Sequence, residues 1–418
     1  MDRNSGGRSN SGGRNRVEER RGPELEANRT GNGRWGQNEW ANGRRDPVTS
    51  LIGRLQSSWT VTVPVVALVV LVLTWQRNLG ALAVAAVAVV LVGSILAAVH
   101  HAEVIAHRVG EPFGSLVLAV AVTVIEVALI ITLMISGGPE TASLARDTVF
   151  AAVMITANGI VGLALLVGAV RFGTVRFNTE GTGAALGVIA MLATMTLVLP
   201  SFTSARSGPE FSPAQLAFAG IASLALYAAF VSTQTVRHRD FFLPVPAHPG
   251  RRAAAADDAE EHAPPPSTRA ALLSLGLLAV ALVAVVGLAK AVSPAIEAGV
   301  KAAGIPESFV GVVIALLVLT PEGIAATRAA LRDRIQTSLN LGYGSAIASI
   351  GLTVPVIALS TLWLEGPLIL GLGSTQIVLL TLTVVVSVLT VAPGRATRLQ
   401  GTVHLILLAA FIFLAINP

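Results

Sequence analysis

The chain of 418 residues contains about eleven apolar runs, each close to the roughly 20 residues that an α-helix needs to cross a bilayer. Hydrophobic residues make up 53% of the chain and charged residues 13%, which leaves too little polar surface for a soluble globule of this size. In lipid, backbone polar groups must be paired within the chain, so such runs fold as helices. The predicted fold is an all-α polytopic membrane protein.

The positions of the predicted helices follow from these runs. They lie near residues 59–75, 79–100, 113–136, 147–170, 183–200, 213–235, 269–293, 308–331, 338–364, 368–391 and 402–416. Most Lys and Arg residues fall in the N-terminal tail and in the loops on the same side of the membrane. Because positive residues favour the cytoplasmic side, we expect the N-terminus inside and the C-terminus outside.

Residues 1–58 are rich in Gly, Asn, Arg and Ser and have no apolar period. Such a segment cannot bury enough apolar surface to offset the entropy of ordering, so we expect a disordered cytoplasmic tail. The first predicted helix, 59–75, is short and precedes the remaining ten. We therefore interpret it as an extra N-terminal helix.

A second break in composition divides the rest of the chain. Residues 236–268 contain several prolines and a short acidic cluster, Asp257–Glu261, which is typical of a cytoplasmic linker. The segments 79–235 and 269–418 on its two sides each hold five predicted helices. Because five is odd, the second set enters the membrane from the opposite side, which predicts two inverted repeats of the kind common in secondary transporters.

Each predicted repeat carries one glutamate near the middle of its second helix, Glu126 in the first and Glu322 in the second. A carboxylate at bilayer depth costs a few kcal/mol or more, so such residues usually face the protein interior and handle an ion or a proton. The matched positions favour a shared site for a cation and protons over the simpler alternative, in which both glutamates only hydrogen-bond neighbouring helices.

Oxygen ligands for a cation are available near both glutamates. Pro321 removes one backbone hydrogen bond in mid-helix and can free a carbonyl oxygen beside Glu322. Calcium binds six to eight oxygens, and two carboxylates supply part of that shell. The other candidate ligands are the polar side chains of Thr123, Asn158, Thr320, Ser345 and Ser349. For these five residues, simple helix-packing contacts are an equal alternative.

Two segments resemble the bacterial ChaA-type calcium/proton antiporters. The first contains His100-His101-Ala102-Glu103, Gly110-Glu111-Pro112-Phe113-Gly114 and Glu126. The second contains Leu319-Thr320-Pro321-Glu322-Gly323 and continues through Ser349-Ile350-Gly351-Leu352. The resemblance covers about residues 60–418. It implies membership of the cation/calcium exchanger superfamily, a location in a bacterial inner (plasma) membrane, and an ion site formed by the third, fourth, eighth and ninth helices with Glu126 and Glu322 as the repeat acids.

The expected function is exchange of Ca²⁺ for H⁺ by alternating access. Two ionised carboxylates at one site repel each other and titrate as a coupled pair, so one dication or two protons can neutralise them. One glutamate could instead bind a monovalent ion while the other keeps its proton, and ChaA-type proteins are associated with sodium and potassium as well as calcium. Na⁺(K⁺)/H⁺ exchange at the same site is therefore the alternative.

Other polar clusters support smaller hypotheses. His100, His101, Glu103 and His107 could bind a metal, but an interfacial collar at the inner end of a helix is the preferred interpretation. Within that collar Glu103, His107 and Glu111 could attract cations or relay protons. Arg328, Arg332, Asp333 and Arg334 are expected to anchor the inner end of a helix. His404 is expected to be structural, with pH sensing as the alternative.

Several functional classes are disfavoured. The chain has no cysteine, which excludes disulfides and Cys nucleophiles. It contains no Walker A motif, so ATP is not expected to drive transport, and no hydrolase motif accompanies the buried acids. One acid per inverted repeat favours alternating access over a cation channel. The expected partners are the lipid bilayer, inorganic cations and protons, without nucleic acid, and no cofactor is expected.

Overall fold

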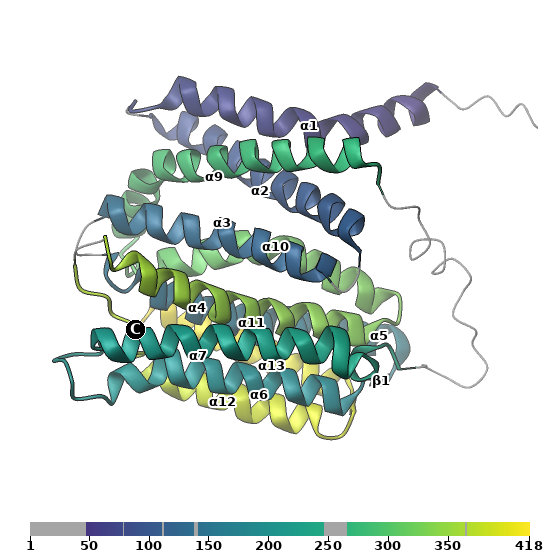
Figure 1. The fold of residues 1–418 in the computed structure, drawn as a ribbon, viewed down its shortest axis with the longest axis vertical. Coiled ribbons are helices and arrows are strands. Elements are labelled where there is room, and N and C mark those ends of the chain that lie inside the picture. The colour runs from purple at the N-terminus through teal and green to yellow at the C-terminus, as the bar shows by residue number, and fades with distance from the viewer. Residues whose placement is uncertain (1–46, 78, 111–112, 138–140, 246–265, 364–365) are drawn as a thin grey trace, which may run out of the picture. The chain divides into compact units, whose positions relative to one another are not determined.

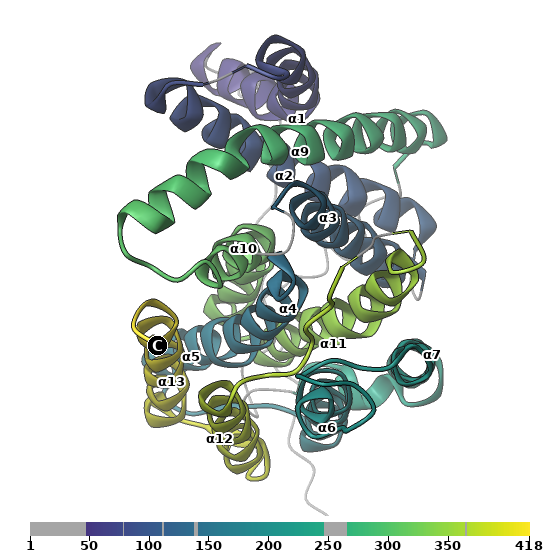
Figure 2. The same ribbon diagram turned by 90° about the vertical axis from the view of Figure 1, so that its left-hand side faces the viewer.

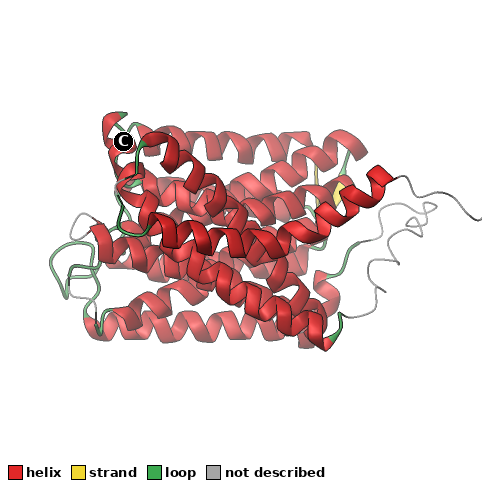
Figure 3. Cartoon of the chain, turned by 90° about the horizontal axis from the view of Figure 1, so that it is seen from above, coloured by secondary structure: helices red, strands yellow, loops and turns green. Residues whose placement is uncertain are grey.

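The computed structural model describes residues 47–77, 79–110, 113–137, 141–245, 266–363 and 366–418. The chain forms two units, Met1–Ile52 and Gly53–Pro418. In the first unit the described residues are 47–52, which are helical. Within the described ranges, ten helices are long and apolar enough to cross a membrane, and Trp59–Thr74 is a shorter apolar helix. The protein is therefore an all-α polytopic membrane protein with about eleven helices (Figure 3).

The helices α1 to α7 follow one another with few interruptions. Their bounds are α1 Pro47–Thr74, α2 Ala81–Val109, α3 Phe113–Gly137, α4 Leu144–Met154, η2 Ile155–Ile160, α5 Val161–Phe172, α6 Thr179–Ala193, η3 Thr194–Val198, η4 Leu199–Ser201, α7 Pro213–Ser232, η5 Thr233–Arg237 and η6 Arg239–Phe242. A π-helical turn, η2, joins α4 and α5 into one span. The two-residue strand β1, Val175–Arg176, precedes α6.

The second group of helices begins after the linker. Its bounds are α9 Thr268–Ala302, α10 Phe309–Leu331, α11 Ile335–Ser360, α12 Ser374–Val391 and α13 Arg398–Ile416. The strand β2, Arg395–Ala396, precedes α13 and pairs antiparallel with β1. The acidic cluster Asp257–Glu261 lies outside the described residues.

Several predicted boundaries are wrong. The helices α2 and α9 continue to Val109 and Ala302, past their predicted ends at 100 and 293. The helix α1 begins at Pro47, so residues 47–58 are helical rather than part of the tail. Proline is favourable in the first turn of a helix, and extending a helix costs little once it has formed. Residues 368–373 were expected to begin a helix, but they are extended, and their backbone donates hydrogen bonds to Ala142 and Pro209 among others. These external partners replace the hydrogen bonds that a helical turn would have made.

Corresponding helices of the two halves pack against each other in a reciprocal pattern. The first helices of the halves, α2 and α9, are in contact. The second helix of each half packs on the third span of the other, α3 on α11 and α10 on α4. The third span of each half also packs on the fifth of the other, α11 on α7 and α5 on α13. This reciprocity places α3, α4, α10 and α11 in the middle of the bundle (Figure 2).

Hydrogen bonds at the helix ends define two faces of the bundle. At the linker face, Asn340 near the start of α11 donates to the Phe242 carbonyl, and Arg108 at the end of α2 donates to Thr268 at the start of α9. At the opposite face, the extended segment before α12 bonds to Ala142 and Pro209. In Figure 1 the linker face, with β1, lies to the right, and the C-terminus lies to the left.

Besides a small cluster that joins Ile130 of α3 to Ile357 of α11, two large hydrophobic clusters form the interior. One joins buried side chains of α4 to α7 with those of α11 to α13. The other joins Ala67 and Leu71 of α1 to buried side chains of α2, α3 and α9. The helix α10 contributes to both clusters, with Val312 and Ala315 in the first and Val310 and Ile314 in the second. The helix that carries Glu322 is therefore held on two sides.

Close packing of α10 on α4 predicts a specific loss of stability. A methyl group at Gly311 would lie 2.8 Å from the backbone nitrogen of Thr148 and 2.9 Å from the Asp147 carbonyl carbon. Overpacking of this kind typically costs about 1–3 kcal/mol. We expect Gly311→Ala to lower the melting temperature of the detergent-purified protein. Gly276→Ala on α9 is the matched control, because a methyl group there meets nothing within 4 Å and alanine favours a helix. Equal melting temperatures for the two variants would contradict this packing.

Candidate functional site

A cavity of about 230 Å³ lies between the two halves and contains both mid-span glutamates. Its walls come from α3, α7 with η5, α10 and α11. The polar and acidic lining residues are Thr123, Glu126, Tyr227, Gln234, Thr235, Glu322, Thr337, Asn340, Ser345 and Ser349. The structure thus brings together five of the seven predicted ligands.

Glu126 lies at the middle of α3 and is only 4% exposed. Its Oε1 accepts a hydrogen bond of 2.6 Å from the Ser349 hydroxyl on α11. This bond joins the first half of the chain to the second. Because a buried carboxyl group needs such partners, Ser349 orients Glu126 toward the cavity.

Glu322 follows Pro321 in α10 and has a different environment. Its Oε2 is buried and accepts no hydrogen bond from any residue that the structure describes. A buried oxygen without a partner is costly and calls for an explanation. Because Glu322 also lines the cavity with Glu126, a bound cation or a proton would supply the missing interaction.

The predicted hydroxyl ligands divide into two groups. Thr123, Ser345 and Ser349 line the cavity. The Thr123 hydroxyl donates a hydrogen bond of 2.9 Å to the Ala119 carbonyl of its own helix, so the lone pairs of the hydroxyl oxygen remain available to a cation. Thr320 is not a cavity residue: it is exposed, and its hydroxyl donates 2.6 Å to the Leu316 carbonyl. Its neighbour Glu322 points inward, so Thr320 two positions earlier turns outward on the helix.

Asn158 also lies away from this cavity. It is completely buried in η2, and its Nδ2 donates 3.0 Å to Thr383 on α12. Its Oδ1 lies 3.1 Å from His404 Nδ1 on α13. The π-helical turn changes which residues share a helix face, so the spacing of a regular helix did not indicate this orientation.

Sequence reasoning missed the polar residues between the glutamates and the linker face. Thr337 and Asn340 on α11 continue the stripe of Ser345 and Ser349, and Gln234 and Thr235 face them from η5. Thr337 and Asn340 are three residues apart and Ser345 and Ser349 are four apart, so each pair shares a helix face and could have indicated the stripe. Asn340 is fixed in place by a 2.7 Å bond to the Phe242 carbonyl.

The other polar clusters lie near the linker face. Glu103 and His107 are exposed, and Glu111 lies outside the described residues. His101 is buried and contacts the Thr60 carbonyl at 2.8 Å and the Ser274 hydroxyl at 3.3 Å. Among the described residues no group of three or more His, Cys, Asp or Glu could hold a metal ion, so the metal hypothesis for the His100 cluster finds no support. Arg328, Arg332, Asp333 and Arg334 lie where α10 ends and α11 begins.

The described lining of the cavity extends toward the linker face. Its lining extends from the glutamates to Thr235 and Thr337, near the linker-face ends of η5 and α11. Toward the opposite face, a layer of buried apolar side chains that includes Ile130 and Val318 follows the glutamates. A separate cavity of about 70 Å³ follows at that face, lined by Leu133, Asp147, Glu297 and Glu307 among others. From Glu126 to Leu133 is seven residues, so the apolar layer is about 10 Å thick at a rise of 1.5 Å per residue.

Comparisons with known proteins agree with this arrangement. The sequence profile of the family described as sodium/calcium exchanger protein matches residues 78–236 and 273–417. The chain is 44% identical over 328 residues to y4hA of Sinorhizobium fredii, described as an ionic transporter, covering 78% of this chain and 87% of that one. It is 35% identical over 352 residues to the sodium-potassium/proton antiporter ChaA of Escherichia coli, covering 84% and 93%.

A solved structure has the same fold. The crystal structure of the H⁺/Ca²⁺ exchanger CAX superposes with a TM-score of 0.62 at 15% identity, covering 86% of this chain and 88% of that one. Both matched segments of the family profile coincide with the five-helix halves that surround the cavity. The chain belongs to the sodium/calcium exchanger protein family, within the cation/calcium exchanger superfamily.

Proposed function

We propose that this protein is a secondary active antiporter that exchanges Ca²⁺ for H⁺, with Glu126 and Glu322 as the shared site. The proposal rests on these two carboxyl groups, one from each half, which line one cavity whose described lining extends to the linker face. Two carboxylates balance the charge of one dication, and Ser345, Ser349 and Thr123 supply further oxygens of the kind that calcium binds.

Exchange follows from competition for the two carboxylates. Either Ca²⁺ or two protons neutralise the pair, whereas the empty, doubly charged site is costly to move through the low-dielectric apolar layer. The cavity at the linker face and the separate cavity at the opposite face support alternating access. With two protons for each Ca²⁺ the cycle is electroneutral. Each pH unit then supplies about 2.7 kcal/mol, at about 1.36 kcal/mol per proton, enough for a roughly hundredfold calcium gradient.

The second candidate function is exchange of Na⁺ or K⁺ for H⁺ at the same site. The specific observation in its favour is the 35% identity to a sodium-potassium/proton antiporter over most of both chains. In this mode one glutamate binds the monovalent ion while the other keeps its proton. The buried Glu322 Oε2 that lacks a partner among the described residues is compatible with either cargo.

We also propose that the linker face is cytoplasmic. Many of the described arginines near the helix ends lie at this face, among them Arg108, Arg171, Arg237, Arg328 and Arg398. Positive residues favour the cytoplasmic side, so the N-terminus would be inside and the C-terminus outside. The membrane would be a bacterial inner membrane, and in this orientation the cavity faces the cytoplasm.

An ion challenge in proteoliposomes tests the proposed function. With an imposed pH gradient, addition of Ca²⁺ is expected to dissipate the gradient, and Na⁺ or K⁺ to have little effect. Dissipation by Na⁺ or K⁺ alone would establish the second candidate instead. At a fixed pH gradient, Ca²⁺ flux should not respond to membrane voltage, because a cycle of two protons for one Ca²⁺ moves no net charge. A strong voltage dependence would exclude this stoichiometry.

A further inference from the structure

A buried chain of hydrogen bonds joins Asn158 to the last helix of the protein. His404 on α13 is completely buried; its Nδ1 lies 3.1 Å from Asn158 Oδ1 and its Nε2 lies 3.1 Å from the Thr390 hydroxyl. Because an amide oxygen only accepts, His404 Nδ1 carries the proton and Nε2 accepts from Thr390. Asn158 in turn donates to Thr383, which donates to the Leu379 carbonyl. All of these hydrogen bonds form with a neutral imidazole, and they use both the oxygen and the nitrogen of the Asn158 amide.

The same imidazole contacts an irregular helical turn. Asn158 lies in η2, a π-helical turn between two α-helical segments. A π-turn contains an extra residue relative to an α-turn and is frequent at functional sites. His404 bonds to the side chain of Asn158 within this turn. His404 therefore holds the side chain of a residue inside the π-helical turn.

Glycines place His404 directly against the turn. A Cβ at Gly162 on α5 would lie 2.7 Å from the Cβ of His404, and a Cβ at Gly401 on α13 would lie 2.5 Å from the backbone nitrogen of Leu166. The two helices thus approach to backbone contact one turn away from Asn158. Such an approach fixes the position of the imidazole and leaves it little freedom to move independently.

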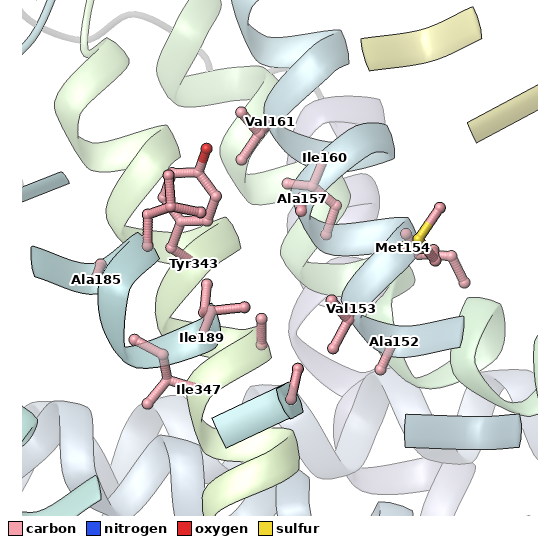
Figure 4. Close-up of a cluster of buried hydrophobic side chains, with 14 of the residues drawn as sticks. Ala152, Val153, Met154, Ala157, Ile160, Val161, Ala185, Ile189, Tyr343 and Ile347 are labelled. Carbon is pink, nitrogen blue, oxygen red and sulfur yellow. The ribbon is translucent and has the colours of Figure 1, made fainter. Parts of the chain in front are cut away.

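The other side of the turn packs on the helices of the ion site. A Cβ at Gly323, next to Glu322, would lie 3.8 Å from Ile160, and one at Gly342 on α11 would lie 3.5 Å from the same residue. Figure 4 shows Ala157 and Ile160 on the side that faces Tyr343, while Met154 points the other way. Asn158 bonds on that other side, since its partners belong to α12 and α13. The Asn158 amide is therefore held on a different face of its helix from the face that packs on the helix of Glu322.

We propose that His404 is a positioning residue that holds Asn158 away from the ion cavity, and that a one-residue shift of the π-turn brings this amide to Glu322 during transport. When a π-turn moves by one residue along a helix, the residue that it moves past rotates about the helix axis by about 100°, the rotation per residue of an α-helix. Asn158 would then take the direction of Ala157, toward α10 and α11. There its amide group can donate to Glu322 Oε2, which has no partner among the described residues, or offer its oxygen to the cation. The inference rests on the proposed cation exchange at Glu126 and Glu322.

The test is a mutant cycle on the full chain in proteoliposomes, with Ca²⁺ as the cation, or Na⁺ if Ca²⁺ does not dissipate a pH gradient. In His404→Leu the lost hydrogen bond frees Asn158, so the KM for the cation should fall about fivefold while the maximal rate also falls. His404→Gln, which keeps a donor and an acceptor, should restore both parameters toward wild type. If His404 acts through Asn158, then His404→Leu should leave KM unchanged in an Asn158→Ala background.

The matched control is His101→Leu, another buried membrane histidine bonded to a carbonyl and a hydroxyl, which should leave KM unchanged. Any of three results would overturn the inference. The KM could be unaltered in His404→Leu, it could fall equally when His404→Leu is made in the Asn158→Ala background, or it could fall equally in His101→Leu. If His404→Leu does not fold, Thr390→Val should change KM in the same direction by a smaller factor. Wild-type protein without cation-dependent proton flux would contradict the proposed function instead. The same set of variants can then be compared by the rise in melting temperature that the cation causes, because this rise requires binding but no transport.

Discussion

Replacing Glu126 or Glu322 with glutamine is expected to abolish exchange in each single variant. Glutamine keeps the size and hydrogen-bonding capacity of the side chain but can neither balance the cation's charge nor carry a proton. Removing one partner of a buried charge interaction typically costs about 3–5 kcal/mol, so the flux should fall by at least a factor of about a hundred. Both residues line one cavity, so neither should compensate for the other.

The measurement is Ca²⁺-dependent decay of a pH gradient in proteoliposomes with equal amounts of folded protein. Glu180→Gln is the matched control, because Glu180 is an exposed glutamate at the start of α6 and does not line the cavity. It should transport at the wild-type rate. Normal flux in Glu126→Gln or in Glu322→Gln would remove that residue from the mechanism.

Filling the cavity from Gly344 is expected to block transport without unfolding the protein. Gly344 lines the cavity on α11, and a side chain at this position begins with nothing within 4 Å. Leucine is a good helix former, so Gly344→Leu should fold, yet its side chain would occupy the path between the linker face and the glutamates. We expect exchange to fall by at least about tenfold while the melting temperature stays within a few degrees of wild type.

Gly187→Leu provides the comparison for this variant. Gly187 lies on the exposed side of α6, also with nothing within 4 Å of an added Cβ, and does not line the cavity. Both variants add the same side chain to a helical glycine, so a difference in flux reports occlusion rather than a general effect of leucine. Wild-type exchange by Gly344→Leu would show that ions do not use this cavity.

The helices were predictable because the membrane allows few alternatives. Apolar length alone identified the ten long apolar helices and the shorter one among the described residues, and the predicted start of that shorter helix, residue 59, is where its apolar segment Trp59–Thr74 begins. Membrane spans have to satisfy their own backbone, so length and composition are sufficient. The extended segment at 368–373 was missed because it is apolar as well, and its hydrogen bonds come from residues far away in the sequence.

The acidic part of the site was predictable, and its surroundings only partly so. Glu126 and Glu322 stand out because a mid-span carboxylate is expensive wherever it lies. Serine, threonine and asparagine cost far less, so their presence does not reveal which way they face. Thr320 points outward on a regular helix. Asn158 points away from the cavity because it lies in a π-helical turn, and the residue pattern did not predict that turn.

The strand pair β1–β2 ties the two halves of the protein together at the linker face. One strand precedes α6 and the other precedes α13, and α5 touches α13 at Gly162 and Gly401 close by. These links hold the start of α13 against α5 and the start of α6. The helices α2, α3 and α9 carry neither strand and meet α10 through another apolar cluster, so we expect the β1–β2 pair to restrain α6 and α13 more than these three helices.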